Sequence, residues 1–240
     1  MVNGLTSANL GIPDYELACK QHEQYIEALK LCGLEVEILP ANEDYPDSTF
    51  IEDVALLTPQ CAIITIPGVP SRKGEVEGVI QTIKKHYSKI EFIHEPGTIE
   101  PGDIMMVGNH YYIGLSARTN KEGAEQMIEI LENYNLKGSL IELHKVLHLK
   151  TGVSYLEHTN LVAAGEFVSA ETFKQFNIIE IDEQESYAAN CIWVNDKVII
   201  PKGYPNSKYK IEKSGYQTIE VDVSEFRKLD GGLSCLSLRF

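Results

Sequence analysis

A cysteine that follows a glycine pair stands near the end of this 240-residue chain. Residues 229–240 read LDGGLSCLSLRF, which places Cys235 shortly after Gly231 and Gly232. A glycine pair lets the backbone approach a ligand closely, and a cysteine is a nucleophile when a histidine and an acid meet it in the folded protein. A buried, inert cysteine has the same local sequence, so the pattern alone leaves both interpretations open.

One histidine and two acidic segments are candidates to work with such a cysteine. His148 lies between two leucines in VLHLKT, where a structural role is the common one. The segment PDSTFIEDVA contains Asp47, Glu52 and Asp53, and EPGTIEPGD contains Glu100. Acids at the start of a strand usually belong to solvated turns. The functional interpretation is an edge that binds a cation, with a histidine that acts as acid and base if the fold brings it there.

The spacing of His144 and His148 is the one feature that indicates a metal. Two histidines four residues apart can bind zinc when they lie on a helix. The segment around them has an extended pattern and contains no third ligand, so we expect no metal site. The phosphate-binding, lipase and zincin motifs are also missing from the sequence.

The composition excludes several classes of partner. Lysine and arginine number 21 against 35 aspartates and glutamates, which gives a formal charge of −14. Nucleic acids and anionic membranes need a basic surface, so we expect neither as a partner. The first residues do not have the pattern of a targeting signal. The five cysteines are scattered with no CxxC pair, which favours a reducing compartment and a cytoplasmic location.

Short apolar runs alternate with helical patterns along the whole chain. We expect strands at residues 34–39, 53–57, 61–66, 90–94, 103–107, 111–115, 139–143, 146–149, 161–164, 191–194, 197–200, 218–221 and 235–238. We expect helices at residues 14–31 with Asp14 as cap, at 76–87, at 119–131 with Thr119 in a capping box, and shorter ones near 170–176, 209–213 and 224–228. Strand pairs are too frequent for a simple doubly wound sheet. We therefore predict an α/β or α+β fold in a single domain over residues 1–240.

Seven phrases together resemble one family, the dimethylargininases (dimethylarginine dimethylaminohydrolases) of the guanidino-group modifying, or pentein, superfamily. The phrases are PDSTFIEDVAL, IPGVPSRKGEVEG, GTIEPGDIMMVG, YYIGLSARTNKEGAE, VLHLKTG, AANCIWVN and EFRKLDGGLSCLSLRF. They run in the family's order to the last residue, so the resemblance covers nearly the whole chain.

The resemblance implies a fold and a set of residue roles. The fold is a five-bladed α/β propeller of ββαβ units with pseudo-fivefold symmetry. Cys235 matches the nucleophile, His148 the general acid and base, and Glu100 the acid that orients the histidine. The residues placed around the substrate are the guanidinium-binding acids Asp47, Glu52 and Asp53, the carboxylate-facing Arg72 and Arg118, Leu229 with a main-chain contact to the amino group, and Leu5 in the lid.

Two departures from the family pattern affect these expectations. The family has Gly-Gly-Asp after the orienting acid, whereas Pro101, Gly102 and Asp103 follow Glu100 here. Proline fixes φ and removes a hydrogen-bond donor, which affects the direction in which the Glu100 side chain points. The Arg-x-Pro strand that precedes the lid in the family has no counterpart before Leu5, so we expect either that a short first strand is missing or that the propeller closes in a different way.

The activity that the resemblance implies is hydrolysis of Nω-methylated L-arginines to L-citrulline and dimethylamine or methylamine. It proceeds through a covalent thiouronium on the cysteine, with no metal and no organic cofactor. The alternative is an arginine deiminase-like hydrolase of unmethylated arginine or a related guanidino compound. Amidino transfer and a non-catalytic binding protein are more distant alternatives. The expected partner is a small-molecule substrate, a methylated arginine, and a homodimer is left open.

Overall fold

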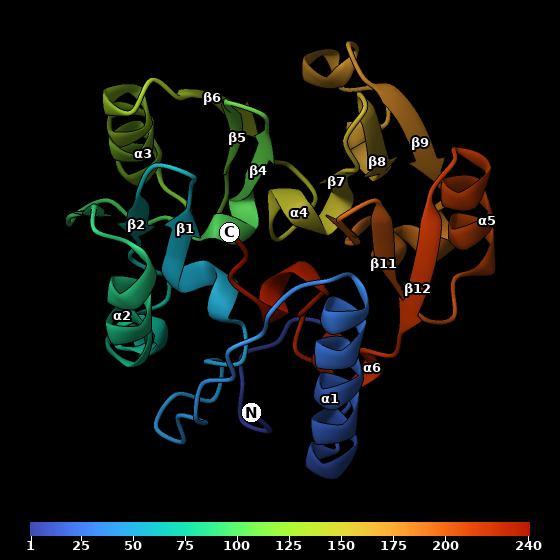
Figure 1. The fold of residues 1–240 in the computed structure, drawn as a ribbon, viewed down its shortest axis with the longest axis horizontal. Coiled ribbons are helices and arrows are strands. Elements are labelled where there is room, and N and C mark those ends of the chain that lie inside the picture. The colour runs from blue at the N-terminus through green and yellow to red at the C-terminus, as the bar shows by residue number, and fades with distance from the viewer. The chain divides into compact units, whose positions relative to one another are not determined.

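The computed structural model describes all 240 residues, and its strands form four separate three-stranded sheets (Figure 1). In each sheet the first two strands pair antiparallel and the third pairs parallel with the second. The strands are β1 (Ala55–Leu57), β2 (Ala62–Ile64), β3 (Ile90–Phe92), β4 (Ile104–Val107), β5 (His110–Leu115), β6 (Lys137–Glu142), β7 (Val153–Tyr155), β8 (Asn160–Ala164), β9 (Asn177–Ile181), β10 (Ile192–Val194), β11 (Lys197–Pro201) and β12 (Gln217–Val221).

A parallel third strand requires a crossover connection, and a helix supplies it in three of the sheets. These helices are α2 (Glu75–His86), α3 (Lys121–Asn133) and α5 (Pro205–Lys213). The β8–β9 connection contains two short 3-10 helices instead, Gly165–Phe167 and Glu171–Phe173. The remaining helices are α1 (Tyr15–Leu31), α4 (Leu149–Gly152) and α6 (Ser224–Arg227). The expected mixed α/β class is therefore confirmed, as four small sheets.

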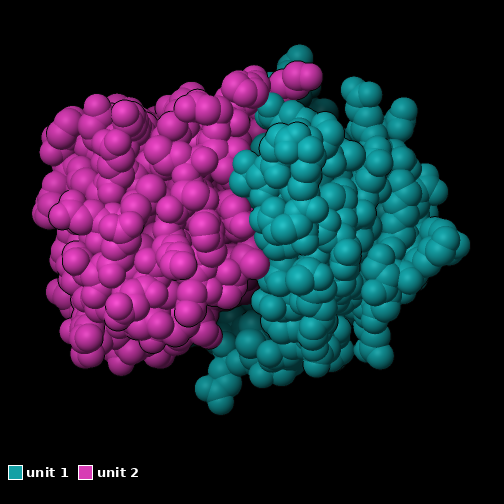
Figure 2. Space-filling view, turned by 90° about the horizontal axis from the view of Figure 1, so that it is seen from above, with its two compact units in different colours: residues 1–40, 151–234 teal, residues 41–150, 235–240 magenta.

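The chain divides into two compact units (Figure 2). Unit 1 consists of residues 1–40 and 151–234, and unit 2 of residues 41–150 and 235–240. Each has its own apolar core, centred on the middle strands of its sheets. Buried members of the unit 2 core include Ile63, Ile99, Ile113, Met127 and Leu131, and those of unit 1 include Val162, Ile181, Val198, Ile200 and Ile211. The single domain over residues 1–240 stays a prediction.

Helix starts follow local capping chemistry, with one change from the expected residue. The Asp14 side chain accepts from the Leu17 N–H at 3.0 Å, so α1 begins where the sequence predicts. The cap of α3 is Asn120, which accepts from the Gly123 N–H at 2.8 Å, and the predicted cap Thr119 is wrong. The Thr119 hydroxyl is instead hydrogen-bonded to Asp103.

Three expected strands are wrong, and each lies where no partner strand is available. Residues 34–39 form no strand, residues 146–149 form a loop that leads into α4, and residues 235–238 overlap the 3-10 helix Ser234–Leu236. Alternating apolar residues predict a strand only when a neighbour completes the ladder. The other ten expected strands are present, and β7 and β9 were not predicted.

None of the helices is both long enough and apolar enough to cross a membrane.

Candidate active site

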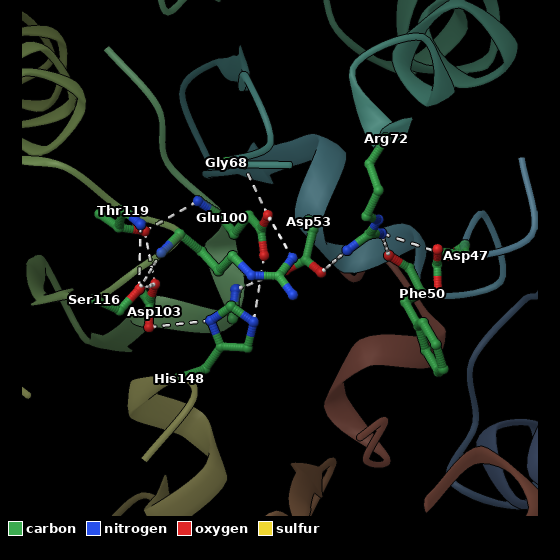
Figure 3. Close-up of polar contacts among 12 residues, drawn as sticks. Asp47, Phe50, Asp53, Gly68, Arg72, Glu100, Asp103, Ser116, Thr119 and His148 are labelled. Atoms are coloured by element: carbon green, nitrogen blue, oxygen red, sulfur yellow. Dashed lines mark hydrogen bonds and ion pairs between the residues drawn. The ribbon is translucent and has the colours of Figure 1, made fainter. Parts of the chain in front are cut away.

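The candidate catalytic residues of unit 2 lie where short helical turns precede strands or helices. Glu52 and Asp53 belong to the 3-10 helix Ile51–Val54, which leads into β1. Glu100 precedes the 3-10 helix Pro101–Asp103, which leads into β4. His148 is the last residue before α4. The ends of separate elements thus carry the polar side chains that converge in Figure 3.

The imidazole of His148 lies between two buried carboxylates (Figure 3). Its Nε2 is 3.3 Å from Glu100 Oε2, and its Nδ1 is 3.2 Å from Asp103 Oδ1. Both acids have no exposed surface. The family resemblance predicted the pairing with Glu100, and the imidazole also contacts Asp103, which lies three residues later in the same turn.

Asp103 is fixed by hydrogen bonds to both of its carboxylate oxygens. Oδ2 accepts from the Ser116 hydroxyl at 2.7 Å and from the Thr119 hydroxyl at 2.6 Å. Oδ1 accepts from the Leu149 N–H at 3.0 Å, the first amide of α4. These hydrogen bonds fix the orientation of the Asp103 carboxylate, so that Oδ1 faces the imidazole.

Glu100 has one satisfied oxygen and one open oxygen. Oε1 accepts from the Gly68 N–H at 2.9 Å and lies 3.5 Å from Arg118 Nη1. Oε2, the oxygen that faces His148, is buried and forms no hydrogen bond of good geometry. Buried polar atoms are rarely left unpaired. Glu100 Oε2 is therefore an acceptor available to a ligand that enters the site.

These two acids decide the charge of His148. Burial disfavours the imidazolium, but the contacts with Asp103 and Glu100 and the charge of Asp53 outweigh it and raise the pKa of His148 to about 10. The ring therefore carries a proton at neutral pH.

The turn after Glu100 accommodates the proline that departs from the family pattern. Pro101 is the first residue of its 3-10 helix, a position where a missing N–H costs nothing, and Glu100 before it is extended (φ −114°, ψ 122°), as a residue before proline prefers. The next residue, Gly102, donates its N–H to Asp53 Oδ1 at 3.1 Å. A Cβ at Gly102 would lie 3.1 Å from His148 Cγ, so this position cannot carry a side chain without moving the imidazole.

Arg72 is buried in this site instead of facing solvent. Only 5% of the residue is exposed, and its Nη1 donates to Asp53 Oδ2 at 2.7 Å while Nε and Nη2 donate to Glu75. Nη2 also donates to the main-chain carbonyl of Phe50 at 3.0 Å. These internal acceptors occupy the guanidinium, so the predicted contact of Arg72 with a substrate carboxylate stays a prediction.

The buried group of Arg72, Asp53 and Glu75 shows how burial and neighbouring charge have opposite effects on the pKa of a carboxylate. Burial opposes ionisation of Asp53, but Arg72 and His148 hold its pKa below the ordinary value. Burial raises the pKa of Glu75 in spite of Arg72. Glu75 was not predicted, although it follows Arg72 by three residues within the first turn of α2.

The other predicted residues of unit 2 are also in buried or half-buried positions. Glu52 is buried and accepts from Lys150 Nζ at 2.5 Å, and Asp47 is buried in the preceding turn, where its main-chain carbonyl lies 3.4 Å from Arg72 Nη2. Cys235 is half-buried and forms no disulfide. The remaining two predicted residues, Leu5 and Leu229, belong to unit 1.

One group of side chains has the geometry of a metal site. Ligand atoms of Asp53, Glu100 and His148 lie within 4.8 Å of one another. However, Arg72 already neutralises Asp53, and a protonated imidazole has no lone pair to offer a metal. The donor set therefore suits a cationic hydrogen-bonding ligand better than a metal ion.

Comparisons with known proteins find similar sequences along the whole chain. A family model described as "N,N dimethylarginine dimethylhydrolase, eukaryotic" matches residues 14–237. The chain is 61% identical over 241 residues to the N(G),N(G)-dimethylarginine dimethylaminohydrolase of Pseudomonas aeruginosa, which covers 100% of this chain and 95% of that protein. It is 31% identical to the protein of the same name from Streptomyces coelicolor, over 94% of this chain and 87% of that one.

Solved structures are similar over the same length. One is a Cys-to-Ser mutant of DDAH from Pseudomonas aeruginosa complexed with citrulline, with 60% identity, a TM-score of 0.99 and coverage of 100% of this chain and 94% of that chain. Another is a His-to-Gly variant of dimethylarginine dimethylaminohydrolase as an adduct with S-methyl-L-thiocitrulline, with a TM-score of 0.98, 60% identity and the same coverage. The N-terminal domain of ArgZ, an arginine dihydrolase, has a TM-score of 0.89 over 98% of this chain and 91% of that one, and at 19% identity it shows the fold alone.

We predict that Arg72→Met destabilises the protein strongly. It leaves Asp53 and Glu75 buried without their cation, which costs about 3–5 kcal/mol, or roughly 6–20 °C in melting temperature for a chain of this size. Thermal unfolding followed by circular dichroism measures the change. Lys73→Met is the matched control, since its exposed pair with Glu95 contributes little. Equal melting temperatures for the two variants would refute the role of Arg72.

We also predict that His148 titrates far above an ordinary histidine and that Asp103→Asn lowers its pKa. NMR titration of labelled histidine rings, assigned with His148→Gln, measures both. Because the folded-state pKa is raised above 6.5, the proton on His148 stabilises the fold fully below about pH 6.5, and this contribution is lost as the pH rises through about 10. A wild-type pKa near 6.5 would contradict the two-carboxylate arrangement.

Proposed function

Because the chain belongs to the dimethylarginine dimethylaminohydrolase family, we propose that it hydrolyses Nω-methylated L-arginines to L-citrulline and methylamine or dimethylamine. The observation that carries this proposal is the 61% identity with the Pseudomonas aeruginosa enzyme over the full chain. The citrulline held by the Cys-to-Ser mutant of DDAH from that organism agrees with the product. The chain is accordingly a hydrolase, and the residue roles below are our assignments.

The acids of unit 2 would bind the guanidinium of the substrate. Asp47, Glu52 and Asp53 are all buried, and the partners of Asp53 leave lone pairs on its oxygens, since each carboxylate oxygen accepts more than one hydrogen bond. A planar guanidinium matches carboxylates in pairs of parallel hydrogen bonds. The open Oε2 of Glu100 adds an acceptor next to His148.

Cys235 would attack the central carbon of the bound guanidinium as a thiolate. A nearby cation stabilises a thiolate, and both the substrate and the protonated His148 are cations. The attack forms a C–S bond and gives a tetrahedral centre. The C–N bond to the methylated nitrogen then breaks, the departing amine takes a proton from His148, and a thiouronium remains on Cys235.

His148 would then act in the opposite sense. Having given up its proton, the neutral imidazole removes a proton from a water molecule that attacks the thiouronium. The C–S bond breaks, citrulline leaves and the thiolate is restored. An alkylamine is a strong base, so an imidazolium with a high pKa can still protonate it, and the bound guanidinium lowers that pKa by charge repulsion.

Arg118 is our candidate for the substrate carboxylate. Its side chain is one-fifth exposed, and its Nη1 is 3.5 Å from Glu100, longer than a direct hydrogen bond. We assign Arg72 the role of holding Asp53 in place, because its guanidinium donates to Asp53 and to other internal acceptors. For the amino-acid end of the substrate we retain Leu5 and the main chain of Leu229.

For the fold, we propose that α1 and the segments beside it correspond to a fifth unit of the propeller. The four observed sheets repeat one connectivity, and residues 34–39 have the alternating pattern of the third strand of such a unit. We further propose a cytoplasmic location, supported by five cysteines that form no disulfide.

We predict that Cys235→Ser abolishes turnover, because a serine hydroxyl is a far weaker nucleophile than a thiolate. Release of citrulline from monomethylarginine measures it. The control is Cys19→Ser, which alters an exposed free thiol of unit 1 and should turn over at the wild-type rate. Wild-type turnover by Cys235→Ser would remove the nucleophile from the proposal.

We predict that kcat/KM for asymmetric dimethylarginine and monomethylarginine exceeds that for arginine by at least about tenfold, the discrimination expected from a pocket shaped for methyl groups. Agmatine lacks the carboxylate and should be a poor substrate. Mass spectrometry of the products, with ammonia and alkylamines quantified separately, tests the panel. If arginine is the best substrate and ammonia is released, the chain is a deiminase on this fold.

A further inference from the structure

The loop that leads to Cys235 has two carbonyls without a hydrogen-bond partner, those of Leu229 and Asp230, between two paired ones. This loop, residues 228–231 of unit 1, follows α6. The Lys228 carbonyl accepts from the Thr6 hydroxyl at 2.7 Å, and the Gly231 carbonyl accepts from the Tyr187 hydroxyl at 2.8 Å. The carbonyl of Leu229, a residue only 4% exposed, has no hydrogen-bond partner. A buried carbonyl without a partner is rare, and it marks an acceptor available to a ligand.

Asp230 fastens the N-terminal segment to this loop. Its Oδ2 accepts from both the N–H of Ser7, at 2.5 Å, and the hydroxyl of Ser7, at 3.0 Å. Its backbone is left-handed (φ 61°), a conformation in which aspartate is enriched among residues other than glycine. These are charge-assisted hydrogen bonds, about twice as strong as neutral ones.

The same N-terminal segment is tied at its other end to α6. The N–H of Asp14 and the Nζ of Lys228 donate to the same oxygen of Glu225, at 2.7 Å and 2.6 Å. We call residues 5–14 the strap. Because it is fastened through Ser7 and again through Asp14, the loop and the strap are positioned together.

Aromatic side chains hold the neighbouring residues of α6. The Arg227 guanidinium lies 4.8 Å from the ring centre of Tyr187 and donates to the Tyr204 hydroxyl at 2.7 Å. Tyr187 is also the donor to Gly231. The loop is therefore held both by the strap and by this aromatic pair.

We propose that Asp230 is a positioning residue for the amino end of the substrate, because it fixes the strap and the loop so that the Leu229 carbonyl stays open to an ammonium donor. This inference rests on the proposed function, in which Leu5 and Leu229 bind an amino acid. Asp230 itself does not touch the substrate. It acts through the conformation of the loop and the strap.

The test combines two ligands with three variants. Asp230→Gly keeps the left-handed backbone free of strain and removes the acceptor for Ser7. We expect KM for monomethylarginine to rise about tenfold, the loss of one hydrogen bond to a charged group, while kcat changes little. The inhibition constant of the monomethylarginine analogue without the α-amino group should not change. Asp230→Asn keeps an acceptor oxygen and should restore most of the affinity.

The matched control is Asp196→Gly, because Asp196 is also left-handed (φ 68°) but lies in the β10–β11 turn. It should leave KM unchanged. If Asp230→Gly weakens both ligands equally, or neither, the positioning role is overturned.

Hydrogen exchange separates this inference from the proposed function, since it needs no substrate. The Ser7 amide of the wild type should exchange about tenfold more slowly than that of Asp230→Gly. Equal rates would overturn the connection between Asp230 and the strap. A wild type that processes no methylated arginine, with the Ser7 amide still protected, would instead refute the proposed function and with it the substrate-positioning role, leaving only the structural connection.

Discussion

Buried negative charge is the constraint on which the candidate site depends. A carboxylate removed from water must be paired or hydrogen-bonded, or it takes up a proton. The acids of unit 2 satisfy this requirement in three small groups: Asp53 and Glu75 around Arg72, Glu52 with Lys150, and Glu100 and Asp103 around His148. Each group ties together elements that are distant in sequence, so the same contacts that pair the acids also fix their positions.

The Arg72 group also illustrates the recognition that we assign to the site. A protein guanidinium is held there by two carboxylates and main-chain carbonyls, with almost no exposure to solvent. The substrate offers the same chemical group, and the acids nearby present the same kind of acceptor. Preorganised acceptors do not need to reorient when the ligand arrives, which is the main source of electrostatic catalysis in enzymes.

The sequence was sufficient for what depends on local pattern and on family motifs. Ten strands, the Asp14 cap of α1 and the pairing of His148 with Glu100 could all be predicted. It was insufficient where a long-range contact decides the outcome. Residues 34–39 alternate like a strand but have no neighbour, Leu149 starts a helix because Asp103 accepts from its amide, and Thr119 binds Asp103 instead of capping α3. The buried pairing of Arg72 with Asp53 could not be predicted either, because nothing in the local sequence of Arg72 indicates this contact.

The proline after Glu100 has a consequence beyond its fit to the turn. Where the family pattern has a flexible glycine, this chain has a residue whose φ is already near the folded value, so the unfolded chain has fewer conformations to lose. Such a replacement at a compatible site contributes about 0.4–1 kcal/mol through the entropy of the unfolded state. The fixed φ of Pro101 thus contributes to the orientation of Glu100 toward His148 before any of the surrounding side chains pack.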